Sequence, residues 1–298
     1  MKYIFFGSPN FAAIVLEKLI KTNLPPAAVV CGPARPAGRN KVLTDPLIKK
    51  LAVAAGLPVF QPENPTDIIS DLKKLSPDFF IVTAYAKILP EEIISLPRLG
   101  TIGLHPSLLP KYRGASPIQG AILDGLSRSG VSIYILDEKM DHGPILAQKD
   151  VDIAGLPYPE VEKKLAELGG YLLAENLTPF FEGKLHPSFQ DHALATFTKK
   201  LTSENGRVEL PDLKAALAGD AKLSSVIHHK ILALNPEPGV FVMIPDRSPT
   251  FTDSSEKPRF KRLKLLKSEL SPDSRLLIKT IQLEGGRPTL DPSINSFI

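Results

Sequence analysis

The apolar run PDFFIVTAY, at residues 77–85, places large hydrophobic side chains at four consecutive positions. Because neighbouring side chains of a strand point to opposite faces, a strand built from this run needs cover on both faces. Strands buried in this way are typical of parallel sheets that carry helices on each side. Other short apolar runs, each expected to form a strand, lie at residues 2–7, 27–32, 101–105 and 130–136.

Amphipathic helical patterns alternate with these strands, one directly after residue 9 and one over residues 157–182. This alternation predicts an α/β fold with a doubly wound, mostly parallel sheet. After residue 206 the pattern changes to one helix and several short alternating runs, which predict a small C-terminal β-barrel of the OB-like kind. We therefore expect an α/β domain at 1–188, a linker at 189–206 and a barrel domain at 207–298.

Positive charge gathers in the last third of the chain. Residues 199–298 hold 16 Lys and Arg against 12 Asp and Glu, a net charge of +4, whereas residues 1–198 hold 20 of each and are neutral. Much of the excess lies at residues 257–270. A concentrated positive surface favours a polyanionic partner such as nucleic acid. The alternative is a solvated strand face that keeps the protein soluble.

The cysteine content bears on the cellular compartment. The single cysteine, Cys31, excludes an internal disulfide and fits a reducing, cytosolic environment. The N-terminal residues lack the basic segment and long apolar segment of a signal peptide. No apolar run approaches the roughly 20 residues that a membrane span needs. We therefore expect a cytoplasmic protein with no membrane partner.

A histidine and an aspartate follow two of the expected strands. His105 ends the run TIGLH, and Asp141 follows the strand at 130–136. Ligands of open parallel sheets bind beyond the carboxyl ends of the strands, so we expect both side chains at one crevice. A carboxylate beside an imidazole fixes its tautomer and stabilises its charged form, which suits proton transfer in acyl-type chemistry. The alternative is a buried histidine that bonds to the backbone.

Two segments near His105 are candidate walls of a ligand pocket. Ser107, Leu108, Leu109 and Pro110 would offer a hydroxyl, apolar surface and a fixed turn to a flat, partly apolar ligand. The second segment is TAYAKILP, at residues 83–90, and it contains Tyr85 and Ile88, for which ordinary core packing is the alternative. No cysteine cluster or histidine–carboxylate spacing predicts a metal site.

Three stretches carry a resemblance to a known family. They are VTAYAKILP, GTIGLHPSLLPKYRGASPIQ and GVSIYILDEKMDHGPIL. Together they resemble the formyltransferases that use 10-formyltetrahydrofolate. The opening IFFGSPNFAAIVLEKL, the loop PARPAGRNKVLTDPLIKKLA and the tail segments LNPEPGVFV and LEGGRPTL narrow the resemblance to the branch that acts on methionyl-tRNA.

The resemblance implies that the amino group of methionine on initiator tRNA attacks the formyl carbon of the folate. His105 and Asp141 match the catalytic histidine and aspartate of the family. Residues 107–110 match its folate-binding segment, with Tyr85 and Ile88 as the second wall. In the inserted loop, Arg39 matches the arginine that reads the acceptor end, and Arg35 and Lys41 add charge for phosphates. We expect no metal, and a monomer that binds folate and initiator methionyl-tRNA.

Gly103 departs from the family pattern, which has an asparagine two residues before the histidine. The asparagine amide is expected to donate to the formyl oxygen, and losing such a donor typically costs about 10²- to 10³-fold in rate. We expect a void at Gly103 that a water or another donor fills, a slower but working enzyme, and a gain in rate from Gly103→Asn.

Two other functions stay open at this point. One keeps the chemistry and changes the acceptor to an amino-sugar or a ribonucleotide amine. The other is a catalytically impaired homologue that binds folate or RNA.

Overall fold

The computed structural model describes residues 1–37, 42–246, 260–291, 293–294 and 297–298. By its internal contacts the chain forms two compact units. Unit 1 comprises Met1–Pro117, Arg128–Asp152 and Pro159–Thr198, and unit 2 comprises Ile118–Ser127, Ile153–Tyr158 and Lys199–Ile298. Within the described residues, no helix is both long and apolar enough to cross a membrane.

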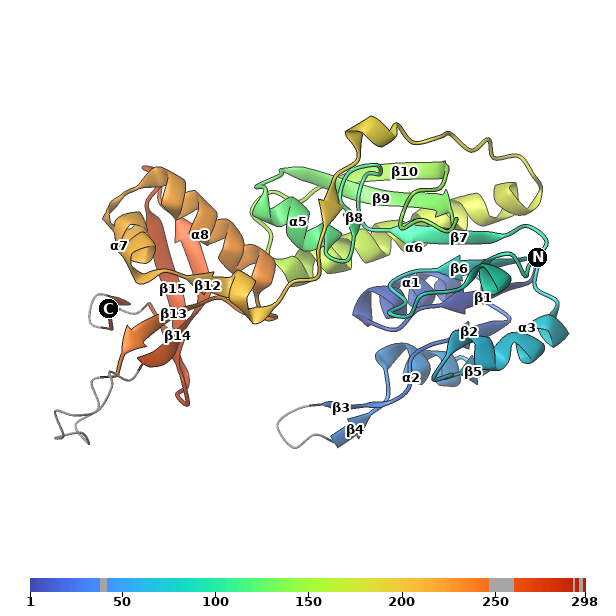
Figure 1. The fold of residues 1–298 in the computed structure, drawn as a ribbon, viewed down its shortest axis with the longest axis horizontal. Helices are drawn as coiled ribbons and strands as arrows, with labels where there is room; N and C mark the ends of the chain where they lie inside the picture. The colour runs from blue at the N-terminus through green and yellow to red at the C-terminus, as the bar shows by residue number, and fades with distance from the viewer. Residues whose placement is uncertain (38–41, 247–259, 292, 295–296) are drawn as a thin grey trace. The chain divides into compact units, whose positions relative to one another are not determined.

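Unit 1 is built on a seven-stranded sheet with the order β10-β9-β7-β6-β1-β2-β5 (Figure 1). The five neighbouring strands β7, β6, β1, β2 and β5 run parallel to one another. Strand β9 is antiparallel to β7, and β10 is antiparallel to β9. The strands are β1 (Tyr3–Phe6), β2 (Ala28–Val30), β5 (Val59–Phe60), β6 (Phe79–Val82), β7 (Thr101–His105), β9 (Arg128–Ile135) and β10 (Ile145–Asp152).

Apolar side chains on both faces of this sheet are covered by helices. On one face, Ile4, Phe6 and Phe80 pack with Leu72 and Ile93 in one hydrophobic cluster. On the other face, Phe79 stacks on Tyr3 and meets Phe180 edge to face. The helices of unit 1 are α1 (Asn10–Lys21), α2 (Leu47–Ala54), α3 (Ile69–Leu75), α4 (Glu91–Ile94) and α6 (Tyr158–Phe181), whereas α5 (Pro117–Leu123) belongs to unit 2 from Ile118 onward. The consecutive apolar side chains of β6 therefore have the cover that the sequence demands.

Two small strand pairs complete unit 1. The first is the antiparallel hairpin of β3 (Arg35–Ala37) and β4 (Val42–Thr44). The second joins β8 (Arg113–Gly114) to β11 (Phe197–Thr198) in parallel. This pairing means that residues up to 198 of the expected linker pack against unit 1.

Unit 2 contains a five-stranded sheet with the order β12-β13-β14-β15-β16, and it is antiparallel except between β12 and β13. In the described residues, the expected barrel is thus a sheet whose edge strands are β12 and β16. The elements are β12 (Arg207–Val208), α7 (Leu210–Ala218), α8 (Ala221–Leu234), β13 (Phe241–Pro245), β14 (Phe260–Leu270), β15 (Leu276–Leu283) and β16 (Pro288–Leu290).

Candidate active site

His105 is the last residue of β7, and its side chain is almost fully buried, with 6% of the residue exposed. Its Nε2 lies 2.9 Å from the carbonyl oxygen of Tyr112. Since a carbonyl oxygen accepts, Nε2 carries the proton in the neutral ring and Nδ1 keeps a lone pair. Nδ1 lies 3.6 Å from Oδ1 of Asp141. The ring is therefore arranged to take a proton at Nδ1, beside a carboxylate that stabilises the positive charge.

Both oxygens of Asp141 accept hydrogen bonds. The backbone N–H of Gly114 donates to Oδ2 at 2.8 Å, and the hydroxyl of Tyr134 donates to Oδ1 at 2.7 Å. Two charge-assisted bonds hold the carboxylate in one orientation. The expectation that Asp141 fixes the tautomer of His105 is wrong, because the carbonyl of Tyr112 does so and the 3.6 Å separation is longer than a hydrogen bond.

Asp141 reaches His105 by a route that differs from the expected one. Because β9 is antiparallel to β7, its carboxyl end lies beside Ile102, at the opposite end of β7 from His105. The loop after β9 then turns back, and the N–H of Ile135 donates to the carbonyl of Pro144. Gly143 permits this close return, since a Cβ there would lie 1.9 Å from the carbonyl oxygen of Ile135.

Gly103 lies opposite Tyr134 in the antiparallel pair of β7 and β9. A Cβ on Gly103 would lie 2.4 Å from Cε1 of Tyr134, closer than packed atoms approach. The expectation of a void at Gly103 is therefore wrong, because the tyrosine ring fills that space. An asparagine does not fit at position 103 unless Tyr134 moves, so the gain expected from Gly103→Asn does not follow.

Sequence reasoning missed Gln190, a buried residue of the expected linker that holds the site together. Its amide nitrogen donates to the carbonyls of Asp141 and Gly143, at 3.0 and 2.7 Å. Its amide oxygen accepts from Nε and Nη2 of Arg113, whose side chain is buried as well. Gln190 thus connects the loop of Asp141 to the start of the β8–β11 pair.

We expect Gln190→Leu to lower the free energy of unfolding by about 3 kcal/mol, because the buried guanidinium of Arg113 and two carbonyls each lose hydrogen bonds to Gln190. Urea denaturation measures this change. Gln61→Leu is the matched control in the same unit, since Gln61 makes one neutral bond, to the carbonyl of Gly32, and its loss should cost about 1 kcal/mol. Equal destabilisation by the two variants would contradict the connecting role of Gln190.

Two histidines stack beside this connection. The rings of His142 and His192 are 4.0 Å apart and nearly parallel, and His142 Nδ1 lies 2.6 Å from Oδ2 of Asp137. Desolvation, His142 and Arg113 together lower the pKa of His192. A neutral His192 fits the contact of its Nδ1 with Nη2 of Arg113, at 2.9 Å, because the guanidinium must donate.

The four residues expected to bind folate, at 107–110, form a tightly held turn. The hydroxyl of Ser107 donates to the carbonyl of Lys111, and the backbone N–H of Leu109 donates to the hydroxyl of Ser132. Ser107 and Leu109 are buried, whereas Leu108 and Pro110 are partly exposed. Contact with a ligand is thus open to Leu108 and Pro110, while Ser107 and Leu109 shape the turn.

In the second expected wall, at residues 83–90, one of the two candidate residues packs in the core and the other is exposed. The ring of Tyr85 packs edge to face on Phe6, and its buried hydroxyl has no hydrogen-bond partner among the described residues. Desolvation raises the pKa of Tyr85 to about 12. Ile88 is 93% exposed and is open to a ligand. The ring of Tyr85 thus packs in the core, and its contact with folate stays a prediction.

A cavity of about 410 Å³ opens beside the loop that carries Asp141. Ile94, Ile135 and Leu136 give it apolar surface, and Thr101, Asp137 and His142 give it polar groups. The six residues expected to bind folate are not among its lining residues. No periodic pattern in the sequence indicates this cavity, because α4, the start of β7 and the loop after β9 build it together.

The residues expected to bind tRNA are described in part. Arg35 lies on β3 and its side chain is exposed. Arg39 and Lys41 lie outside the described residues. In unit 2, Arg262, Lys264 and Lys267 of β14 are exposed, and the alternation with buried Leu263 places the first two on one face.

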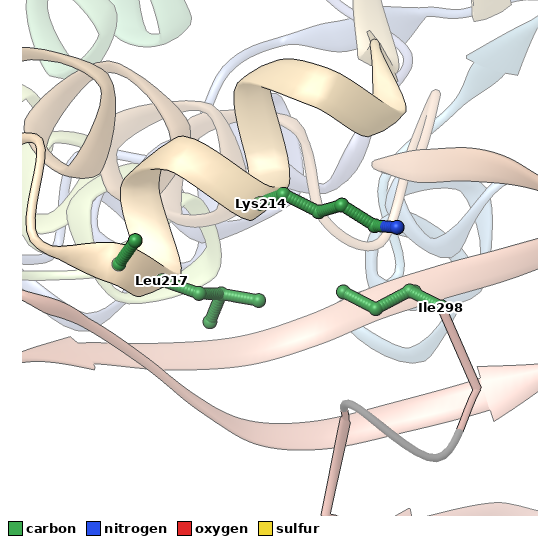
Figure 2. A pocket seen from close by; sticks show the side chains of 4 residues that line it. Lys214, Leu217 and Ile298 are labelled. Carbon is green, nitrogen blue, oxygen red and sulfur yellow. The ribbon is translucent and has the colours of Figure 1, made fainter.

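Another cavity, of about 390 Å³, lies in unit 2 (Figure 2). The side chains of Lys214 and Leu217, both from α7, extend toward Ile298. We assign no chemistry to this cavity.

Comparisons with known proteins decide the family. Residues 1–177 match the family model described as formyl transferase. The chain is 40% identical over 246 residues to a methionyl-tRNA formyltransferase of Chloroflexus aurantiacus, and the match covers 81% of this chain and 76% of that relative. The chain belongs to the formyl transferase family. The resemblance read from its motifs is confirmed.

Two solved structures share the fold of this formyltransferase at low sequence identity. One is the N-formyltransferase of Helicobacter canadensis in complex with folinic acid and dTDP-3-aminofucose (TM-score 0.62, 17% identity, 91% of this chain and 88% of that one). The other is the methionyl-tRNA formyltransferase of Clostridium thermocellum (TM-score 0.56, 15% identity, 95% and 98%). The predicted α/β domain followed by a β domain is confirmed.

Proposed function

We propose that this formyltransferase moves the formyl group of 10-formyltetrahydrofolate to the amino group of methionine on initiator tRNA, in the cytoplasm. The observation that carries the proposal is the buried pair of His105 and Asp141, with Nδ1 of the histidine facing the carboxylate at 3.6 Å. The 40% identity to a methionyl-tRNA formyltransferase supports this acceptor over an amino-sugar or a ribonucleotide amine.

The pair provides a place for one proton during the transfer. Nδ1 of His105 accepts the proton that the amine loses as its nitrogen bonds to the formyl carbon. It returns the proton to the folate nitrogen when the bond between that nitrogen and the formyl carbon breaks, so the protein ends the cycle unchanged. Asp141 stabilises the charged ring between these steps, and its two hydrogen bonds keep it in place.

The cavity of about 410 Å³ is suited to the flat ring of the folate. Its apolar side chains Ile94 and Leu136 would contact the ring faces, and the carboxylate of Asp137 would accept from ring N–H groups. The cavity is lined by Thr101 of β7 and by the loop after β9, the two elements that carry His105 and Asp141. Of the six residues that the sequence predicts to bind folate, Leu108, Pro110 and Ile88 are exposed enough to contact it as well.

The exposed cations support tRNA as the acceptor. Arg35 on the β3–β4 hairpin, together with Arg39 and Lys41 of the same sequence segment, would contact phosphates of the acceptor stem. Arg262 and Lys264 on β14 would contact further phosphates. Such contacts position the nucleic acid without reading its sequence.

Incubation with 10-formyltetrahydrofolate and charged initiator methionyl-tRNA tests the proposal, with chromatographic detection of formylmethionine. We expect turnover with the charged tRNA and none with an amino-sugar nucleotide. Raising KCl from 50 to 200 mM should raise the KM for tRNA by at least about tenfold and leave the KM for the folate nearly unchanged, because phosphate contacts weaken steeply with salt. Absence of formylmethionine, or preference for the sugar nucleotide, would contradict the proposal.

A further inference from the structure

The ring of Tyr134 occupies the space into which a side chain at position 103 would project. A Cβ on Gly103 would lie 2.4 Å from Cε1 and 2.6 Å from Cζ of Tyr134, and 2.5 Å from Cδ1 of Leu136. Gly103 and Tyr134 are direct partners across β7 and β9. Cross-strand partners have neighbouring Cβ positions, so a large side chain on one strand leaves room for a small one on the other. Glycine at position 103 is what admits the tyrosine ring.

The hydroxyl of Tyr134 points at the catalytic carboxylate. It donates to Oδ1 of Asp141 at 2.7 Å, and that same oxygen lies 3.6 Å from Nδ1 of His105. Tyr134 is 7% exposed. Desolvation first, and the neighbouring Asp141 second, raise the pKa of Tyr134 well above its ordinary value, so the hydroxyl keeps its proton at neutral pH.

We propose that Tyr134 is a positioning residue for formyl transfer, and that Gly103 and Tyr134 together replace the asparagine that the family has at position 103. The inference rests on the proposed function. Tyr134 brings a hydrogen-bond donor into the space that the asparagine side chain would need, but from the neighbouring strand. It acts through Asp141, whose second oxygen is held by the N–H of Gly114. The hydroxyl thereby keeps Oδ1 facing the imidazole.

Tyr134→Phe tests the hydroxyl, because it keeps the ring above Gly103 and removes one oxygen. We expect kcat to fall about 10- to 100-fold, as for the loss of a bond to a charged group, while the KM for folate and tRNA stays within about twofold. Tyr3→Phe is the matched control, since Tyr3 is a buried tyrosine whose hydroxyl donates to the carbonyl of Leu24, and its kcat should not change.

Substitutions at positions 103 and 134, singly and together, test whether the two side chains compete for the same space. Gly103→Asn alone should lower both stability and kcat, because its Cβ meets the tyrosine ring. Tyr134→Ala alone should lower kcat as well, since it loses both hydroxyl and ring. Gly103→Asn combined with Tyr134→Ala should be more active than Tyr134→Ala, because the amide then enters the space that the ring leaves, into which the flexible end of Leu136 can also shift. Such non-additivity is the signature of two residues that share one site.

The outcomes separate this inference from the proposed function. An active wild type with an equally active Tyr134→Phe variant overturns the inference and leaves the function standing. So does a Gly103→Asn variant that is as stable and active as the wild type, or a double variant no better than Tyr134→Ala. A wild type that forms no formylmethionine overturns the proposed function, and the positioning role with it.

Discussion

His105→Gln is expected to lower kcat for formyl transfer by about 10²- to 10⁴-fold, the range that a lost general base typically costs. The glutamine amide can still donate to the carbonyl of Tyr112, as Nε2 of His105 does at 2.9 Å. It has no basic lone pair at the position of Nδ1, so the proton of the attacking amine has no acceptor beside Asp141. The buried end of β7 should keep its conformation, because the backbone contact is retained.

Single-turnover formylation, with enzyme in excess over methionyl-tRNA, measures this loss without interference from product release. Folate affinity and the free energy of unfolding are the controls, and both should stay close to the wild-type values. A variant with the wild-type single-turnover rate would show that another group takes the proton. A variant that is slow but also unfolded would instead call for His105→Asn, whose shorter side chain is easier to accommodate.

Asp141→Asn is expected to lower kcat by about 10²- to 10³-fold. The asparagine oxygen can still accept from the N–H of Gly114, which places the NH₂ group at the position of Oδ1. That NH₂ group cannot accept from the hydroxyl of Tyr134, as Oδ1 does, and it turns a donor instead of an acceptor toward Nδ1 of His105. The variant also loses the negative charge that stabilises the protonated ring.

The same single-turnover assay applies to this variant, with Asp150→Asn as the surface control. Asp150 on β10 forms an ion pair with Arg128 on β9. An exposed ion pair of this kind contributes little to stability. We expect the control to match the wild type. Normal formylation by Asp141→Asn would exclude the carboxylate charge from the mechanism.

The parallel strands and the pair of His105 and Asp141 could be predicted from the sequence because each rests on a local pattern. Consecutive apolar residues at 79–82 demand a strand covered on both faces, whatever follows them. The sequence does not predict, however, the route by which Asp141 reaches His105. The antiparallel direction of β9 follows from pairing with β7, a long-range property, and only the returning loop brings Asp141 to the imidazole.

Gln190 and Tyr134 could not be found in the same way. Gln190 lies in a polar stretch without periodicity, and its role comes from pairing with Arg113, 77 residues earlier in the chain. In the sequence, Tyr134 is one residue of the apolar run at 130–136, and nothing in that run distinguishes it from a packing residue. Its function depends on the register that sets it opposite Gly103, which no local pattern contains.

The close fit between positions 103 and 134 also limits how descendants of this sequence can diverge. A lineage that regains an asparagine at 103 must first pass through a genotype in which one of the two changes stands alone, and each of those intermediates is expected to be impaired. Selection would remove most such intermediates before the second change arises. The pair should therefore be inherited together, and the two positions should covary wherever related sequences carry the tyrosine.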